Sequence, residues 1–312
     1  MTLSKEKKSI KYKILKKTAL PIFLSCTALL FFYNESAKLG FINGLKLSAQ
    51  TIIPAIFPFF ILSDLLLCFF EPKGNFLSRI FEKLLDISSS GFKAYIIGVL
   101  CGFPLGAKCA ARLYSENKIT LKECERLCAI ASSPSLAFVI SGIGLGLRGS
   151  IKDGILMYFC VIISSILTGI VFKNAREKSR ILEEITEQNF VLTDSIRRAA
   201  SSSLSISAYI ALFSSLLFLI DSLIKKDILL LFISAFLEVG NASVLISRSS
   251  LFPLHISFSL TAFSLSFSGI SAFMQGAEFL PGEASKSKIF FMKLIQGVIS
   301  FFIAEIIFKL LI

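Results

Sequence analysis

Nine long apolar segments, separated by shorter polar stretches, constrain this chain of 312 residues more than any other feature. They run approximately over residues 18–33, 47–70, 92–113, 127–147, 152–172, 199–224, 227–247, 253–275 and 289–312. A helix needs about 20 apolar residues to cross the hydrocarbon core of a bilayer, and most of the segments reach that length. The pattern predicts an all-α polytopic protein of the cell membrane, with one membrane domain.

The composition agrees with this class, because 54% of the residues are hydrophobic and only 17% are charged. A soluble domain carries roughly 25% charged residues. The net charge is +12, and the basic residues lie mainly in the loops that flank the apolar segments. This is the distribution that the positive-inside rule describes. We therefore expect membrane lipids, and no nucleic acid, as partners of these loops.

The N-terminus carries seven lysines before residue 18, and the first apolar segment follows at once. No convincing signal-peptide cleavage site comes after it. We expect residues 1–40 to form a cytoplasmic basic N-terminus and an uncleaved first transmembrane helix.

A polar stretch over residues 173–198 divides the rest into two comparable parts, 41–172 and 199–312. Each part runs in the same order: an apolar segment, an interrupted segment, a serine-rich segment and a plain span. Weak internal repeats with corresponding interruptions are typical of secondary transporters. We predict two repeats joined by a cytoplasmic linker.

The topology of the first segment in each repeat stays open. If 47–70 and 199–224 are re-entrant hairpins, more Lys and Arg residues fall on the cytoplasmic side, and the two repeats become inverted. Pro54 and Pro58 could help to turn the first hairpin. Both segments are also long enough to span the membrane fully, which is the alternative.

Two interruptions lie inside apolar segments: Gly102-Phe103-Pro104-Leu105-Gly106, with Lys108 beside it, and Glu238-Val239-Gly240-Asn241. Gly and Pro weaken helix interiors. A broken helix in a bilayer persists only where it is buried in protein or lines a wet cavity. Two facing breaks would therefore form a polar site near the midplane. The alternative is that each break only permits a kink or close packing.

Glu238 lies deepest in an apolar segment. A carboxylate there costs several kcal/mol unless it is paired, protonated or hydrated. We expect a proton or cation relay, or a hydrogen-bond partner of a substrate. The structural alternatives are a pair with Lys108 or a hydrogen bond with Asn241. Lys108 could instead bind an anion or extend to the cytoplasmic face.

Small polar residues complete the candidate site, although serine-rich helix interfaces are also ordinary in membranes. The candidate substrate- or ion-binding residues are Gly102, Phe103, Pro104, Gly106, Lys108, Ser132, Ser133, Pro134, Ser135, Glu238, Gly240, Asn241, Ser266, Ser268, Gly269 and Gln275.

Catalytic motifs are absent from the sequence. Cys124 and Cys128 are four residues apart, but no second pair or nearby histidine completes a metal site. The single histidine, His255, has no local triad motif, and there is no phosphate or dinucleotide loop. A membrane enzyme for a lipid-linked substrate would need clustered titratable groups at one interface. We expect no enzyme, no metal and no cofactor.

Two runs carry a resemblance to a known family: LKLSAQTIIPAIFPFFILSDLLL and GVLCGFPLGAKCAARLYSENKITLKECERLCAIASSPSLAFVISGIGLG. They resemble the family of the sporulation integral membrane protein YlbJ. The matching elements are residues 57–61, Gly102 to Lys108, residues 119–127 and Ser132 to Ser135. The second part of the chain follows the family order more loosely.

That family is similar to the nucleoside-recognition gate group, which includes spore maturation membrane proteins and resembles concentrative nucleoside transporters. The resemblance implies re-entrant hairpins, broken helices and a role in spore cortex formation at the mother-cell or forespore membrane. We expect transport or gating of a small polar solute. The alternative is a scaffold that recruits other sporulation membrane proteins, or further copies of itself.

Overall fold

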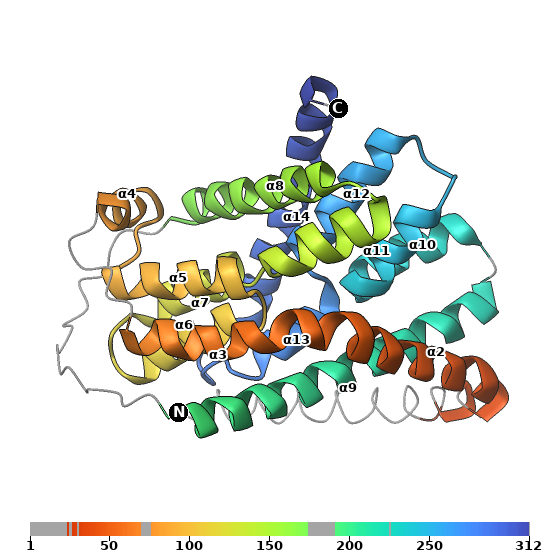
Figure 1. Cartoon of the computed structure of the whole chain (residues 1–312), viewed down its shortest axis with the longest axis horizontal. Coiled ribbons are helices and arrows are strands. Elements are labelled where there is room, and N and C mark those ends of the chain that lie inside the picture. Colours follow the sequence, from red (N-terminus) through yellow and green to blue (C-terminus); the bar gives the residue numbers. More distant parts are fainter. Residues whose placement is uncertain are drawn as a thin grey trace, which may run out of the picture.

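The computed structural model describes residues 24, 27–29, 31–69, 76–173, 191–224 and 226–311. Helices account for most of this part of the chain, and it contains no strand, so the all-α prediction is confirmed. Most of the helices run along the long axis of the molecule (Figure 1). Of the predicted first transmembrane helix over 18–33, only residues 24, 27–29 and 31–33 are described, so the prediction lies largely outside the described residues.

The first part of the chain contains helices that are broken or bent at several points. In order, they are α2 (Asn34–Leu47), the π-helix η1 (Ser48–Ile52), α3 (Ile53–Phe69), α4 (Phe76–Leu85), α5 (Ser89–Cys101), α6 (Leu105–Ser115), α7 (Leu121–Ile130), the π-helix η2 (Phe138–Leu147) and α8 (Ile151–Val171).

The second part begins with the longest described helix. Its elements are α9 (Leu192–Ile224), α10 (Asp227–Leu237), α11 (Val239–Arg248), α12 (Leu254–Phe267), α13 (Gly269–Ala277) and α14 (Lys286–Leu311).

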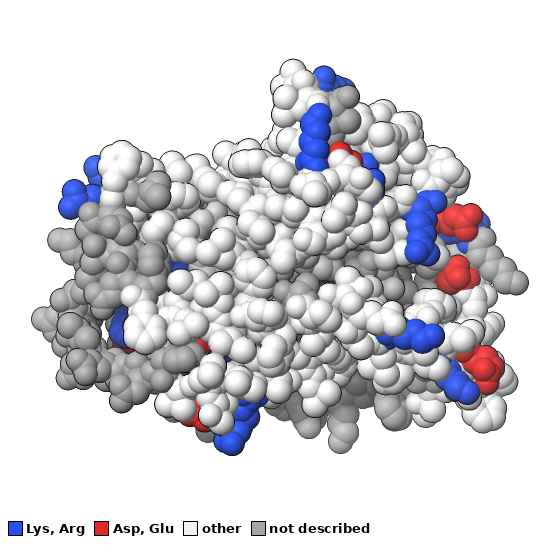
Figure 2. Space-filling view, viewed as in Figure 1, with Lys and Arg blue, Asp and Glu red and all other residues white. Residues whose placement is uncertain are grey.

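Several of these helices can cross a membrane. Among the described residues, four segments are long and apolar enough: α8, α9, α12 together with α13, and α14. Two bent pairs, α2 to α3 and α4 to α5, raise the number to six if each is one span. Figure 2 shows a broad face with few charged side chains between charged ends of the molecule. The protein is thus a multi-pass integral membrane protein.

The re-entrant hairpin predicted for 199–224 is wrong. These residues lie inside α9, a single helix of 33 residues. Its serines do not interrupt it. Two of them bond to carbonyls of the preceding turn: Ser207 Oγ donates to Ser203 O at 2.9 Å, and Ser222 Oγ donates to Leu219 O at 2.7 Å. The alternative of a long helix that spans fully fits these residues.

The described residues of the predicted hairpin at 47–70, which are 47–69, also lack a tight hairpin turn. The chain continues as helix from α2 through η1 into α3 and bends between Ile52 and Ile56, around Pro54. Because proline has no backbone N–H, the regular α-helical bond to Gln50 cannot form. The wider π turns over Ser48–Ile52 lie directly before this position.

Helices α2 and α9 bring the two parts of the chain together. Gly40 and Gly44 face α9 so closely that a Cβ on either would lie 2.6 Å from Ser214 O or from Ala211 Cα. Small residues at this spacing let helix backbones approach in a membrane. Farther along α9, Arg198 Nη2 lies 2.9 Å from Asp64 Oδ2 of α3, which adds an ion pair between the two parts.

Candidate functional site

Two interrupted helices of the first part meet at their interruptions. The chain leaves α5 at Gly102, which has a φ of +83°, and enters α6 after a cis Phe103–Pro104 bond. Phe103 N donates to Ser133 O at 2.8 Å, in the extended stretch between α7 and η2. A Cβ on Gly102 would lie 2.4 Å from Ser135 N. Backbone therefore touches backbone, and only glycine fits at residue 102.

Gly106 extends this contact by one turn. A Cβ there would lie 2.0 Å from Ala131 O. The sequence prediction that this element breaks its helix is confirmed, and the break packs against a second break that the serine-rich segment supplies.

The second part repeats the arrangement. Glu238 separates α10 from α11, and its carboxylate accepts hydrogen bonds from Gly240 N at 2.8 Å, Asn241 N at 2.6 Å and Asn241 Nδ2 at 2.9 Å. Ser268 and Gly269, both with positive φ, separate α12 from α13. A Cβ on Gly269 would lie 3.0 Å from Leu237 O, so these two interruptions also touch.

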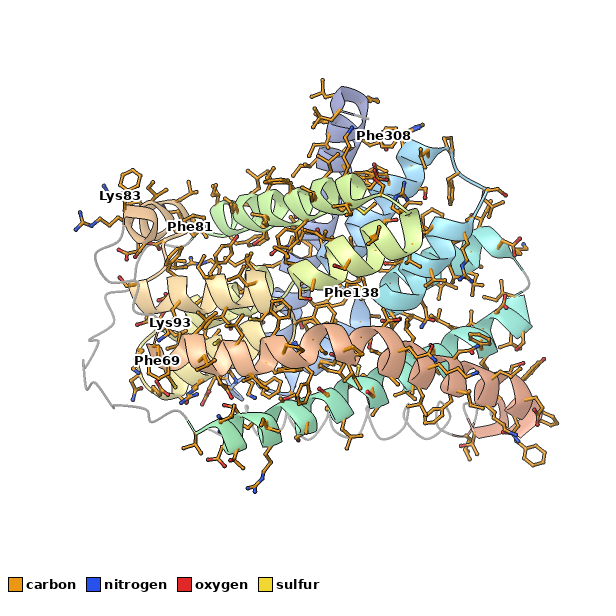
Figure 3. All side chains as sticks on the ribbon, viewed as in Figure 1. Phe69, Phe81, Lys83, Lys93, Phe138 and Phe308 are labelled. Atoms are coloured by element: carbon orange, nitrogen blue, oxygen red, sulfur yellow. The ribbon has the colours of Figure 1, made fainter. Side chains whose placement is uncertain are left out.

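A small cavity, here called the central cavity, lies where all four interrupted helices converge. It measures about 30 Å³, which is room for one or two water molecules. Its lining residues are Ile52, Ile56, Phe103, Pro134, Ser135, Phe138, Ile206, Ile210, Glu238, Val239, Ser271, Ala272 and Gln275. Figure 3 shows Phe138, the first residue of η2, near the middle of the molecule.

The polar groups of the central cavity are mainly acceptors. Glu238 is 2% exposed, and no cation pairs with it in the described part of the chain. Gln275 is 3% exposed; its Nε2 donates to Ser271 Oγ at 3.4 Å, and its Oε1 has no hydrogen-bond partner. A carboxylate and an unsatisfied amide oxygen together favour a ligand that donates hydrogen bonds or carries positive charge.

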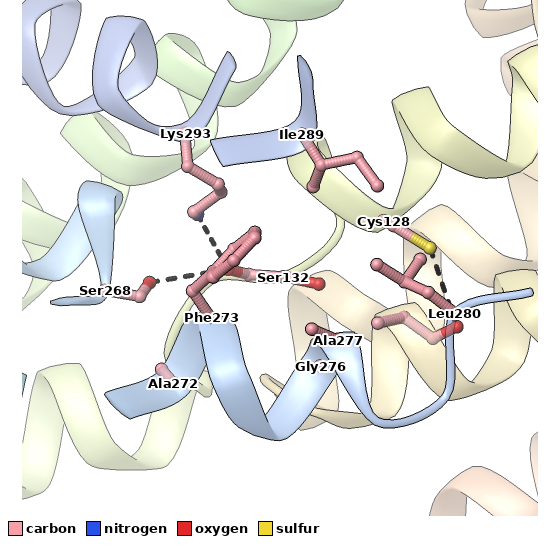
Figure 4. A pocket seen from close by; sticks show the side chains of 11 residues that line it. Cys128, Ser132, Ser268, Ala272, Phe273, Gly276, Ala277, Leu280, Ile289 and Lys293 are labelled. Atoms are coloured by element: carbon pink, nitrogen blue, oxygen red, sulfur yellow. Dashed lines mark hydrogen bonds between the residues drawn. The ribbon is translucent and has the colours of Figure 1, made fainter. Parts of the chain in front are cut away.

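A second cavity of about 20 Å³, here called the Lys293 cavity, lies on another side of α13, and Ala272 lines both cavities. Lys293 of α14 is 3% exposed. Its Nζ donates to Ser132 O at 2.7 Å and to Gln296 Oε1 at 3.1 Å, and Gln296 Nε2 donates to Ser133 Oγ at 3.1 Å. Figure 4 shows Lys293 and Ser268 directed toward Ser132.

Sequence reasoning missed Lys293 and Gln296. The available signal was their spacing: three residues apart, they lie on one face of a helix whose neighbouring residues are mainly apolar.

The candidate residues divide by position. Phe103, Pro134, Ser135, Glu238 and Gln275 line the central cavity, and Ser132 and Ser268 line the Lys293 cavity. Gly102, Pro104, Gly106, Gly240 and Gly269 form or flank the interruptions, and Ser133 and Asn241 hydrogen-bond to residues around them.

Lys108 and Ser266 lie outside both cavities. Lys108 Nζ is 5.8 Å from the centre of the Phe279 ring and forms no ion pair with Glu238, so the suggested pair is wrong. The other alternative, a hydrogen bond between Glu238 and Asn241, is confirmed. Ser266 Oγ lies 3.3 Å from Ser164 Oγ between α12 and α8, where it contributes to packing.

The comparison with known proteins supports the resemblance seen in the sequence. The chain is 26% identical to the sporulation integral membrane protein YlbJ of Bacillus subtilis (strain 168), over 88% of this chain and 78% of the relative. No family model matches the chain, and no solved structure matches it significantly. The similarity to a sporulation integral membrane protein thus extends over most of the chain.

Proposed function

We propose that this protein binds a small polar solute at the central cavity and transports it, or gates its passage, across the membrane. One observation carries the proposal. Four interrupted helices converge on a cavity that contains an unpaired buried carboxylate, Glu238, and an unsatisfied amide oxygen, Gln275 Oε1. Ionisable groups inside a membrane domain are costly, and they mark pathways of ions and substrates.

Passage requires the interrupted helices to separate. A cavity of about 30 Å³ admits little more than water, so a larger solute needs a wider site. The contacts that close the site join short helix pieces, such as α6 to the stretch before η2 and α13 to the end of α10. Rigid movement of such pieces around a fixed site is how alternating access works in transporters built from repeats.

The similarity to a sporulation integral membrane protein supports a proposal for the cellular setting. We place the protein in endospore formation, at the mother-cell or forespore membrane, with a contribution to the cortex and with the N-terminus and the 173–198 linker in the cytoplasm. We further propose that the two parts are inverted repeats of the gate type. The inversion no longer rests on hairpins at 47–70 and 199–224; instead, α2 with α3 and α9, which begin the two parts, run in opposite directions along the long axis (Figure 1). In support, each part has two broken helices that meet at their interruptions, followed by a long span, α8 or α14.

A scaffold that recruits partner proteins is the second candidate. It is favoured by the degree to which the interruptions satisfy each other, as in the bond from Phe103 N to Ser133 O, and by the small volume that they leave. In this reading, the polar interruptions only hold the helices together.

Cysteine accessibility in native membranes separates the two candidates. Single cysteines at positions 103 and 239 are introduced into a chain without its seven native cysteines and treated with a small hydrophilic thiol reagent. The proposal expects time-dependent labelling at both. Position 266 is the buried control, and position 282, where a side chain meets open space, is the accessible control. Labelling at 282 alone would overturn the transport proposal.

Sporulation tests the role of the carboxylate. We expect Glu238→Gln to reduce heat-resistant spores at least tenfold at normal protein level. The matched control is Glu305→Gln, because Glu305 of α14 also lies in an apolar segment but bonds to Ser259 Oγ, away from both cavities. Equal spore counts for the two variants would contradict the proposed role of Glu238.

A further inference from the structure

Lys293 is a buried cation without an acidic partner. Arg148 pairs with Asp153 at 3.1 Å and Lys288 pairs with Glu125 at 3.0 Å, whereas the buried Arg126 bonds to the backbone carbonyl of Asp86. Within the described ranges, Lys293 Nζ bonds only to neutral oxygens, those of Ser132 and Gln296. An ammonium group has three N–H donors. One donor and the whole charge therefore remain to be compensated.

The cavity beside Lys293 contains further donors and no acidic side chain. Its lining consists of Ala107, Cys128, Ser132, Ser268, Ala272, Phe273, Gly276, Ala277, Leu280, Ile289 and Lys293. Ser132 Oγ is buried there without a hydrogen-bond partner. Figure 4 shows Ser132 and Lys293 in the same pocket, with Ser268 beside them. A cation and an unused hydroxyl thus face one small space.

We propose that the Lys293 cavity binds one small monovalent anion of the size of chloride. The Lys293 ammonium supplies the countercharge, and the Ser132 hydroxyl donates a hydrogen bond. A buried unpaired charge costs several kcal/mol, and an anion in contact with it removes most of that cost. The volume of about 20 Å³ fits a monatomic ion and excludes sulfate or phosphate. The inference does not rest on the proposed transport function.

Thermal unfolding of the purified full-length protein in detergent tests the site. The melting temperature is measured in sodium chloride, bromide, gluconate and sulfate at equal ionic strength. A ligand that binds only the folded state raises the melting temperature in a saturable way. We expect a saturable rise of about 3–5 °C in chloride and in bromide relative to gluconate, and no saturable rise in sulfate, whose general stabilising effect grows steadily with concentration. Equal melting temperatures in chloride and gluconate would overturn the proposal.

Variants assign the effect to the cavity. Lys293→Met is expected to lose the chloride response, whereas Lys309→Met, near the exposed end of the same helix, is expected to keep it. A Lys293→Met protein that still responds like the wild type excludes this site. If Lys293→Met does not fold, Ser132→Ala is measured instead. The site is supported if the chloride concentration that gives half of the maximal rise in melting temperature increases several-fold. The site is excluded if that concentration does not change.

Discussion

The two parts of the chain satisfy their interrupted helices by different chemical groups. In the first part, Phe103 N donates to Ser133 O, a backbone carbonyl of the neighbouring helix break. In the second part, Gly240 N and Asn241 N donate to the carboxylate of Glu238, a side chain of the same break. Each solution provides acceptors for N–H groups that the interrupted helices leave without a partner in their own helix.

The first interruption depends on the shape of its surroundings, and the second depends on a charged side chain. A backbone carbonyl is neutral and fixed, so the first interruption depends on close fit at Gly102 and Gly106. A carboxylate accepts strong hydrogen bonds only while it is ionised, and its charge is costly in a membrane. The hydrogen bonds of the second interruption therefore depend on the ionisation of a side chain, whereas those of the first depend on backbone fit alone.

Gly102→Ala is the substitution with the largest expected effect, because it disrupts the close packing of the first interruption. Its Cβ would lie 2.4 Å from Ser135 N at a positive φ, so both the space and the conformation oppose it. We expect a loss of about 3 kcal/mol or more, seen as loss of monodisperse protein in size-exclusion chromatography. Gly142→Ala is the control, since its nearest new neighbour is Phe138 Cδ2 at 3.5 Å.

Glu238→Ala tests the second interruption and is expected to cost about 2–4 kcal/mol, because three buried or half-buried donors lose their acceptor. Glu238→Gln keeps one carbonyl oxygen and should cost about half as much. The melting temperatures of the two variants measure the difference. If alanine and glutamine have the same effect, the hydrogen bonds do not hold this break.

Asn241→Ala is expected to have a smaller effect. Asn241 Nδ2 donates to Glu238 Oε2 at 2.9 Å and to Ser214 Oγ at 2.6 Å on α9. Removal of the amide should cost about 1–2 kcal/mol and leave the backbone bonds to Glu238 intact. A loss as large as that of Glu238→Ala would show that Asn241, and not the carboxylate, organises the second interruption.

Ser266→Ala should have the smallest effect, because Ser266 belongs to neither interruption. Its hydroxyl meets only Ser164 Oγ, at 3.3 Å, among the described residues. We expect a change of about 1 kcal/mol or less in the free energy of unfolding. A larger loss would mean that the contact between α12 and α8 supports the interruptions at a distance.

The sequence predicted the interruptions at residues 102–106 and 238–241, because Gly, Pro and Glu are costly inside membrane helices unless a site uses them. It did not predict which breaks touch each other, since that depends on contacts between segments far apart in the chain. The burial of Lys293 could not be predicted from the sequence, because Lys286 and Lys288 nearby are typical of the charged flank of a membrane helix. The hairpin at 199–224 was wrong because charge counting cannot distinguish a long helix from a turn.

The close contact between α2 and α9 has a consequence for how the protein is made. Gly40 and Gly44 give α2 a small, bare face whose partner surface, around Ala211 and Ser214, is synthesised much later. Every other described helix of the first part has been synthesised before that surface leaves the ribosome. During insertion, α2 is therefore exposed to lipid or to the insertion machinery. The two parts pack together only after α9 has been inserted.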